Sequence, residues 1–172
     1  MTPEWSRTER VETIGERERS VAISADEGER AALARRFDLV AIDRLEATVA
    51  LRREAGRVVA TGRVSAAVTQ ACSITDEPLG VTIDEPIELR FVEEVDREEE
   101  VELSEDALDT MPIEDGTIDL GEAAAETMAL ALDPFPRAPN AAEALREAAV
   151  LGEEDVGPFS ALAGLKDKLA GR

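Results

Sequence analysis

The strongest constraint on the fold is a two-residue alternation of apolar and polar side chains that runs from Arg44 to Phe91. The stretches RLEATVALRR, RVVATGRVSAAVTQAC, PLGVTI and IELRF each place their apolar residues on one face. This period is that of half-buried β-strands. The stretches REAG and TDEP supply turns, so the sequence predicts an antiparallel β-meander with Pro86 at a bulge or an edge.

An amphipathic helix is predicted before the meander, from about Glu27 to Phe37. The residues at its start form a capping box, either of Ser24 with Glu27 or of Asp26 with Glu29. The arginines of this segment lie away from its apolar face, so the helix is expected to cover one face of the sheet.

A second helix is predicted to begin with a capping box of Asp119 and Glu122 and to continue to about Leu132. The stretch DPFPRAP ends it, because proline cannot continue a helix. Three shorter patterns predict minor elements. These are edge strands at Val11–Ile14 and Val21–Ile23, and a short helix in NAAEALREAAVLG.

The expected fold class is α+β: an antiparallel β-meander with one face covered by amphipathic helices, an acidic loop insertion and a helical C-terminal tail. Between Glu93 and Asp115 acidic residues outnumber basic ones twelve to one. Such a segment buries too little apolar area to offset its conformational entropy. We therefore expect a single domain over 1–136 with a mobile acidic loop at 93–117. Residues 137–172 are expected to form a partly helical or disordered tail.

The amino-acid composition excludes several kinds of catalytic and metal site. The chain has no histidine and one cysteine, which excludes Ser-His-Asp and Cys-His catalysis, an internal disulfide and a structural zinc site. No secretory leader or membrane-spanning run is evident. The net charge of −20 favours a basic partner over nucleic acid or an anionic membrane. We expect a cytoplasmic, non-enzymatic protein without metal, cofactor or small-molecule substrate.

Cys72 lies in the turn TQACSITDEPLGVTI. Its acidic neighbours are expected to raise the pKa of its thiol, and no imidazole exists to act as its base. A small residue packed at a strand end is therefore favoured over a nucleophile.

Three sets of residues are candidate partner contacts. The first is the arginine-bearing sector 30–70, whose arginines could touch phosphates or could only add solubility. The second is DPFPRAP, which either presents an arginine on a stiff exposed segment or is a helix terminator packed by its phenylalanine. The third is the apolar face of a predicted C-terminal helix. The candidates are Arg52, Arg53, Arg57 and Arg63; Asp133, Pro134, Phe135 and Arg137; and Phe159, Leu162 and Leu165.

Several motifs in order resemble the YceD family, the large ribosomal RNA subunit accumulation proteins, and its alphaproteobacterial-type branch in particular. They are EWSRTERVETIG, DEGERAALARRFDL, QACSITDEPLGVTIDEPIELRFV, IDLGEAAAETMALALDPFPRAP and GPFSALAGLKDKL. Many members carry C-x-x-C at the turn that here holds Cys72, Thr75, Glu77 and Pro78. Because Thr75 replaces the second cysteine, neither metal nor disulfide chemistry is carried over.

The resemblance implies a bacterial factor that supports synthesis, processing or stability of large-subunit (23S) ribosomal RNA, in a family not known as enzymes. The main hypothesis is an indirect action through a basic protein, such as a ribosomal protein or assembly factor. The alternative is direct RNA binding through sector 30–70. An enzyme that relies on carboxylates alone is a third hypothesis.

Overall fold

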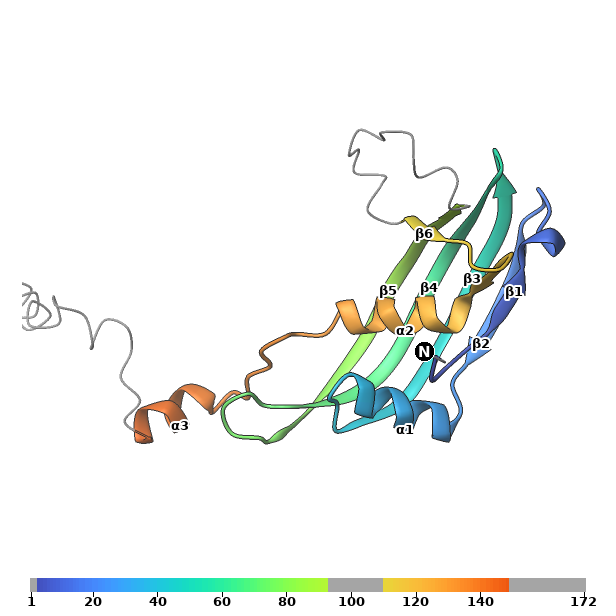
Figure 1. Cartoon of the computed structure of the whole chain (residues 1–172). Helices are drawn as coiled ribbons and strands as arrows, with labels where there is room; N and C mark the ends of the chain where they lie inside the picture. The colour runs from blue at the N-terminus through green and yellow to red at the C-terminus, as the bar shows by residue number, and fades with distance from the viewer. Residues whose placement is uncertain (1–2, 93–109, 149–172) are drawn as a thin grey trace, which may run out of the picture.

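The computed structural model describes residues 3–92 and 110–148, which form a long curved sheet with the two longer helices on one side (Figure 1). The elements in chain order are β1 (Thr8–Arg10), a 3-10 turn (Val11–Thr13), β2 (Arg19–Ser24), α1 (Glu27–Arg36), β3 (Ala41–Glu54), β4 (Arg57–Ala71), β5 (Pro78–Val92), β6 (Thr110–Pro112), β7 (Thr117–Asp119), α2 (Leu120–Leu130) and α3 (Ala141–Glu147). Among the helices that the structure describes, none has the length and apolar content to cross a membrane.

The main sheet has the order β2-β3-β4-β5-β6, and the first four strands are antiparallel neighbours. The short β6 runs parallel to the end of β5, and β1 pairs with β7 in a separate two-stranded sheet. The predicted α+β class and antiparallel meander are therefore confirmed. Pro86 lies in register opposite Arg63 without a bulge, on a stretch of β5 whose other side meets no described strand.

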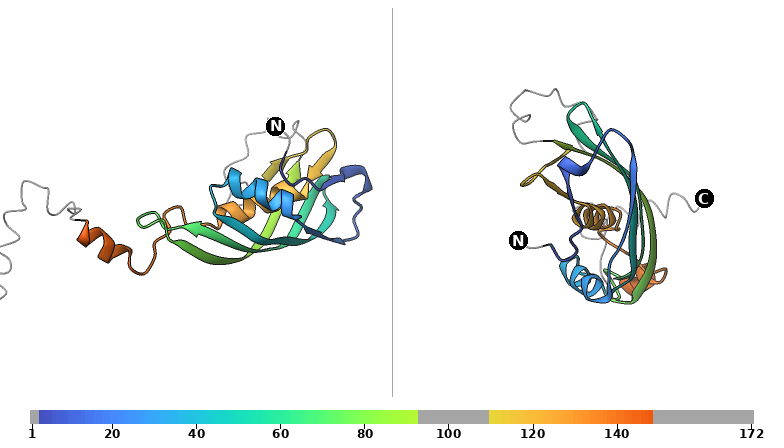
Figure 2. Two further views of the ribbon diagram at one scale, coloured as in Figure 1. Left: turned by 90° about the horizontal axis from the view of Figure 1, so that it is seen from below. Right: turned by 90° about the vertical axis from the view of Figure 1, so that its right-hand side faces the viewer.

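The alternating apolar residues all face the same side. In register, Val49 lies opposite Gly62, and Gly62 lies opposite Ile87, so one row of the core crosses three strands. Figure 2 shows α2 end-on inside the curve of the sheet, with α1 beside it. The helices thus cover the concave face, and burying this apolar surface is the main source of stability.

Gly62 is required at its position by a close approach of two strands. A Cβ atom built there would lie 2.0 Å from the carbonyl oxygen of Thr48 on β3. No side chain fits at that distance, so only glycine is tolerated at this point of β4.

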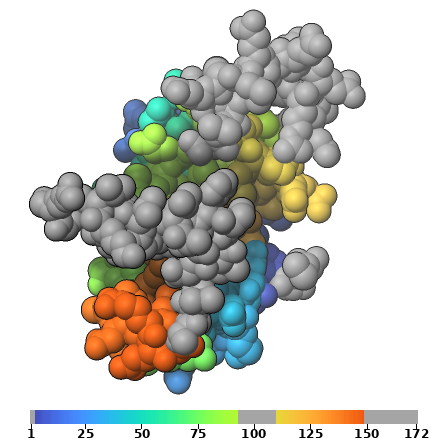
Figure 3. Space-filling model, turned by 90° about the vertical axis from the view of Figure 1, so that its left-hand side faces the viewer, coloured from blue at the N-terminus to red at the C-terminus, as the bar shows by residue number. Residues whose placement is uncertain are grey.

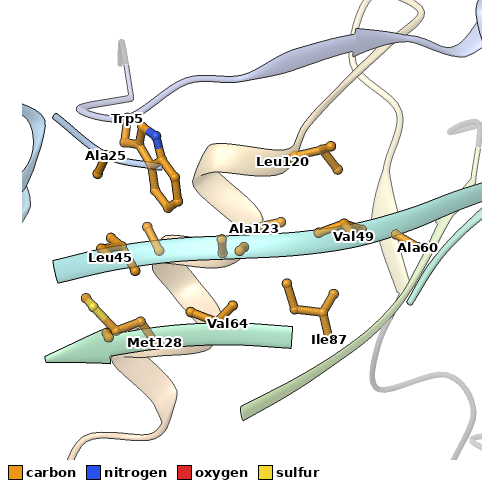
Figure 4. Packing of buried hydrophobic residues seen from close by; sticks show 14 of the residues in the cluster. Trp5, Ala25, Leu45, Val49, Ala60, Val64, Ile87, Leu120, Ala123 and Met128 are labelled. Carbon is orange, nitrogen blue, oxygen red and sulfur yellow. The ribbon is translucent and has the colours of Figure 1, made fainter. Parts of the chain in front are cut away.

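The largest buried side chain is Trp5, which the alternation and helix patterns do not identify. Its ring points toward β3 near Leu45, on the side of the sheet that α2 covers (Figure 4). The indole nitrogen is buried and has no hydrogen-bond partner among the described residues. The segment before β1 is therefore part of the core.

The segment Glu4–Arg7 also makes polar contacts with both helices, which we call the N-terminal clasp. The guanidinium of Arg7 donates to both carboxylate oxygens of Glu29 on α1, at 2.7 and 2.9 Å. Arg36, at the end of α1, donates to Glu122 on α2 at 2.6 and 2.9 Å and to Glu4 at 2.9 Å.

The clasp also contains the start of α2. The carboxylate of Asp119 accepts hydrogen bonds from the backbone N–H groups of Arg7, Gly121 and Glu122. Asp119 is thus the N-cap, as predicted, but the reciprocal bond of a capping box is absent because Glu122 pairs with Arg36. For α1 the structure selects the Asp26 and Glu29 capping box.

Two minor predictions need correction. Val11–Thr13 form a 3-10 turn rather than a strand, and the edge pairing is made by the three residues before it. The predicted acidic loop at 93–117 lies outside the described residues up to position 109, and its end is structured, with β6 at Thr110–Pro112. The second predicted edge strand is confirmed as part of β2.

Candidate functional site

The first candidate site is the turn between β4 and β5, against which the chain after α2 packs; we call Gln70–Glu77 with Asp133–Ala141 the turn cluster. The amide of Gln70 donates to the carbonyl of Asp133 at 2.9 Å. The backbone N–H of Ser73 donates to the carbonyl of Pro136 at 2.8 Å. One side-chain and one backbone hydrogen bond between residues far apart in sequence thereby attach DPFPRAP to the sheet end.

Cys72 lies at the centre of this cluster with none of its surface exposed. Its sulfur packs against Ala138 and Ala141 and accepts a hydrogen bond from the backbone N–H of Ala138 at 3.2 Å. The preferred prediction, a packed cysteine at a strand end, agrees with this position.

The expected direction of the thiol pKa was wrong. Hydrogen bonding from the Thr75 hydroxyl, and then from the backbone N–H of Ala138, lowers the pKa of Cys72 to about 7. The acidic side chains of the turn are exposed, whereas these donors contact the sulfur directly, and donors that stabilise a thiolate lower its pKa.

The Thr75 hydroxyl also lies 3.2 Å from a carboxylate oxygen of Glu77. Within residues 3–92 and 110–148, no three Cys, Asp or Glu side chains gather in a way that could hold a metal ion. The turn is closed by backbone hydrogen bonds from the N–H of Cys72 to the carbonyl of Glu77 and from the N–H of Asp76 to the carbonyl of Cys72, so its shape does not depend on a second thiol.

Most side chains of the segment DPFPRAP are exposed, although Ala138 is buried against Cys72. Phe135 is 70% exposed, and Pro134 and Arg137 are also exposed. The alternative that Phe135 packs a helix terminator is therefore wrong, because backbone and Cys72 contacts hold the segment instead. Phe159, Leu162 and Leu165 lie outside the described residues.

Two of the four candidate arginines are paired with carboxylates on the outer face of the sheet. Arg63 binds Asp84 at 2.7 Å, and this hydrogen bond lowers the pKa of the Asp84 carboxyl. Arg52 contacts Glu54 at 2.9 Å and Glu18 at 3.7 Å.

The other two candidate arginines differ from these and from each other. Arg53 faces the helices, where its guanidinium donates to the carbonyl of Val11 at 2.6 Å and supports the 3-10 turn. Arg57 is exposed and makes no ion pair with the described part of the chain. The four candidate arginines thus differ in role: two form ion pairs, one supports a turn and one is exposed. The structure does not bring them together into one site.

The outer face of the sheet carries mixed charge. By strand register, positive and negative side chains alternate over it: Arg44, Arg52, Arg57, Arg63 and Arg90 with Glu46, Glu54, Asp84 and Glu88. A face of this kind has little net potential with which to attract a polyanion.

A groove lies between the edge of β5 and the last turn of α2. It has a volume of about 480 Å³, and its lining is apolar apart from carboxylates and one threonine. Leu130 lies at this groove and is 87% exposed, which makes it the most exposed large apolar side chain among the described residues. Sequence analysis did not find this groove, because it depends on where α2 crosses the sheet.

The family model for the large ribosomal RNA subunit accumulation protein YceD matches residues 60–166, which is more than half of the chain. The chain belongs to the YceD family. The YceD match covers most of β4 and all of β5, the turn cluster, α2 and α3. The turn cluster and the groove between β5 and α2 therefore both lie within it. No curated protein and no solved structure is similar enough to this YceD chain to count as a match.

Proposed function

We propose that this protein supports the accumulation of large-subunit ribosomal RNA as a non-enzymatic binding protein, acting in the cytoplasm through a basic protein partner. The link to large-subunit ribosomal RNA in this proposal comes from the description of the family. The observation that carries the choice of partner is the state of the candidate arginines. Arg52 and Arg63 bind carboxylates of the same chain, and Arg53 binds a backbone carbonyl. Within the described residues this leaves Arg57 as the one candidate without such a contact.

Direct RNA binding requires cations that neutralise phosphates and release counterions. Arg63 and Arg52 would first have to leave Asp84 and Glu54, whose carboxylates would then repel the phosphates. The net charge of −20 adds a long-range repulsion of the same sign. A basic ribosomal protein meets the opposite conditions, and charge complementarity would speed its association more than it tightens the complex.

The contact surface we propose combines the acidic stretch of 93–109 with the exposed side chains of DPFPRAP. Phe135 offers an apolar anchor in this second part, and Pro134 and Pro136 limit the entropy lost when the segment is ordered by a partner. Aromatic anchors surrounded by polar residues are typical of protein interfaces.

The test is affinity purification of the tagged full chain from bacterial cells, at low and moderate salt, with and without ribonuclease. The expected result is a basic large-subunit protein or assembly factor, identified by mass spectrometry, that is retained after ribonuclease and weakened by salt. Partners that disappear with ribonuclease would overturn the proposal in favour of direct RNA binding.

A matched pair of variants tests the proposed surface with the identified partner. Changing Glu98, Glu99 and Glu100 to Gln should weaken binding by about tenfold, mainly through slower association. Changing Glu46 and Glu54 to Gln and Asp84 to Asn on the outer sheet face alters the net charge equally and should leave most of the binding intact. Equal losses in both variants would contradict a defined acidic contact.

A further inference from the structure

The groove between β5 and α2 has the features of an occupied binding surface. Its floor consists of Ile87, Leu89 and Ala131, and Leu130 projects at its mouth with 87% of its surface exposed. Within the described residues, β5 is paired on this side only at Arg90–Val92. Apolar side chains beside an open strand edge normally have a partner, because the alternative is aggregation.

The charge of the groove is negative. Glu85 and Glu88 line it, and no arginine does so. Glu126 lies on the same helix one turn before Leu130, and burial together with the neighbouring Glu122 raises the pKa of its carboxyl. A segment with apolar side chains between positively charged ones would bury its apolar side chains on the floor of the groove and pair its charges with these carboxylates.

The C-terminal segment of this chain has that pattern. In GPFSALAGLKDKLAGR the residues Leu162, Leu165 and Leu169 have helical spacing. At 3.6 residues per turn, Lys166 and Lys168 would flank this leucine stripe on either side, and Asp167 would lie opposite. The other long segment outside the described residues, 93–109, is strongly acidic and has the wrong sign for the groove.

The chain is long enough to reach the groove. Ala141, at the start of α3, packs with Leu79 near the beginning of β5, and α3 lies toward the same end of the molecule as α1 (Figure 3). From Leu79 to Ile87 the strand covers about 26 Å, and the length of α3 adds about 10 Å. The eleven residue steps from Ala148 to Phe159 span up to about 36–40 Å.

We propose that residues 158–170 bind in the groove between β5 and α2 of the same molecule, with their leucines on Ile87, Leu89 and Leu130 and their lysines beside Glu85 and Glu88. This use of Leu162 and Leu165 replaces the partner contact that sequence analysis suggested for them. The inference rests on the groove and not on the proposed function.

The sequence provides a selective test, because Lys166 and Lys168 are its only lysines. Carbodiimide couples lysine amines to carboxylates that they contact, so every lysine cross-link in the native full chain reports the position of this segment. Mass spectrometry should find cross-links to Glu85, Glu88 or Glu126. Cross-links to acidic residues within 153–167 are expected for any arrangement and are used only for normalisation.

A pair of variants separates specific binding from chance proximity. Leu130→Asp should reduce the cross-links to Glu85 and Glu88 about tenfold, because it places a charge on the apolar contact. Val40→Asp is the control, since Val40 is also exposed (59%) but lines a different groove beside α1. Both side chains are exposed, so neither substitution should unfold the protein.

Three results would overturn the proposal. One is cross-linking mainly to Glu27 and Asp43 at the groove beside α1. Another is an equal decrease, in the Leu130→Asp and Val40→Asp variants, of the cross-links from the lysines to Glu85 and Glu88. The third is cross-linking between chains in a mixture of light and ¹⁵N-labelled protein, which would show that a second copy occupies the groove.

Discussion

The two ends of α2 are built in different ways. At its first residues, Asp119 caps the helix, Glu122 pairs with Arg36, and the Trp5 side chain is fully buried beside it. At its last residues, Leu130 is exposed and the chain continues into a segment held by backbone carbonyls and the Cys72 sulfur. One end is therefore a scaffold that buries side chains, and the other presents them to solvent.

The contrast indicates where the surface can change without loss of the fold. The contacts of the N-terminal clasp are made by side chains, so substitutions there remove stability directly. In the turn cluster most contacts are made by the backbone, so exposed side chains such as Phe135 and Arg137 are free for recognition. The predictions below test this division.

The largest expected effect is that of Trp5→Ala. Removal of a fully buried indole should lower the free energy of unfolding by about 3–5 kcal/mol, as measured by urea denaturation. Phe135→Ala is the matched aromatic change at the other end of α2 and should cost less than about 0.5 kcal/mol. Similar losses for both would remove the distinction between the two ends.

Gly121→Ala should destabilise the protein by about 1–3 kcal/mol in the same assay. The added Cβ would lie 2.4 Å from the carbonyl oxygen of Trp5, so the helix or the clasp must shift. Gly80→Ala on β5 is the control, because a Cβ there meets no atom within 4 Å. A Gly121→Ala variant with an unchanged free energy of unfolding would show that the clasp is loosely packed.

Cys72→Ala should change how stability depends on pH. The pKa of Cys72 is lowered to about 7 in the folded chain from the ordinary thiol pKa of 9.0. Between these values the unfolded thiol holds a proton that the folded thiolate has lost, so stability should rise from pH 7 to pH 9 and the contribution should be lost below about pH 7.

Thermal unfolding of the wild type and the Cys72→Ala variant at several pH values measures this difference. The chain has no histidine or tyrosine, so few other groups titrate in this window. The variant should show a flat profile between pH 7 and pH 9. An equal rise in both proteins would assign the effect to another group.

The smallest expected effect is that of Arg36→Ala, with a loss of about 1 kcal/mol. Arg36 bridges Glu4 and Glu122 and is only 27% exposed, so its network is stronger than a pair at the surface. Arg52→Ala on the outer sheet face should lower the free energy of unfolding by less than about 0.5 kcal/mol. Added salt should reduce the difference between the losses of the two variants, because it screens ion pairs. Urea denaturation at low and high salt checks both values.

Local patterns were sufficient to predict the elements of the fold. Alternation from Arg44 to Phe91 predicted β3, β4 and β5, and the residues Asp26 and Asp119 marked the starts of both large helices. These properties depend on residues close in sequence, so no knowledge of packing is needed to read them.

The candidate site was less predictable. Cys72 was placed in a packed turn, but the direction of its pKa depends first on the orientation of the Thr75 hydroxyl and then on the N–H of Ala138, which is distant in sequence. The arginine sector was visible as a charge excess, although the pairing of Arg63 with Asp84 depends on the register of β4 and β5.

By itself the sequence determined the period of each segment, the helix caps, the net charge and the absence of imidazole chemistry, because each is a property of neighbouring residues or of composition. The tertiary structure was needed to show that Trp5 completes the core, that Arg36, Arg52 and Arg63 pair with carboxylates and that an acidic groove opens beside Leu130. Those outcomes depend on which distant segments meet when the sheet curves around α2, since burial and ion pairing act through space rather than along the chain.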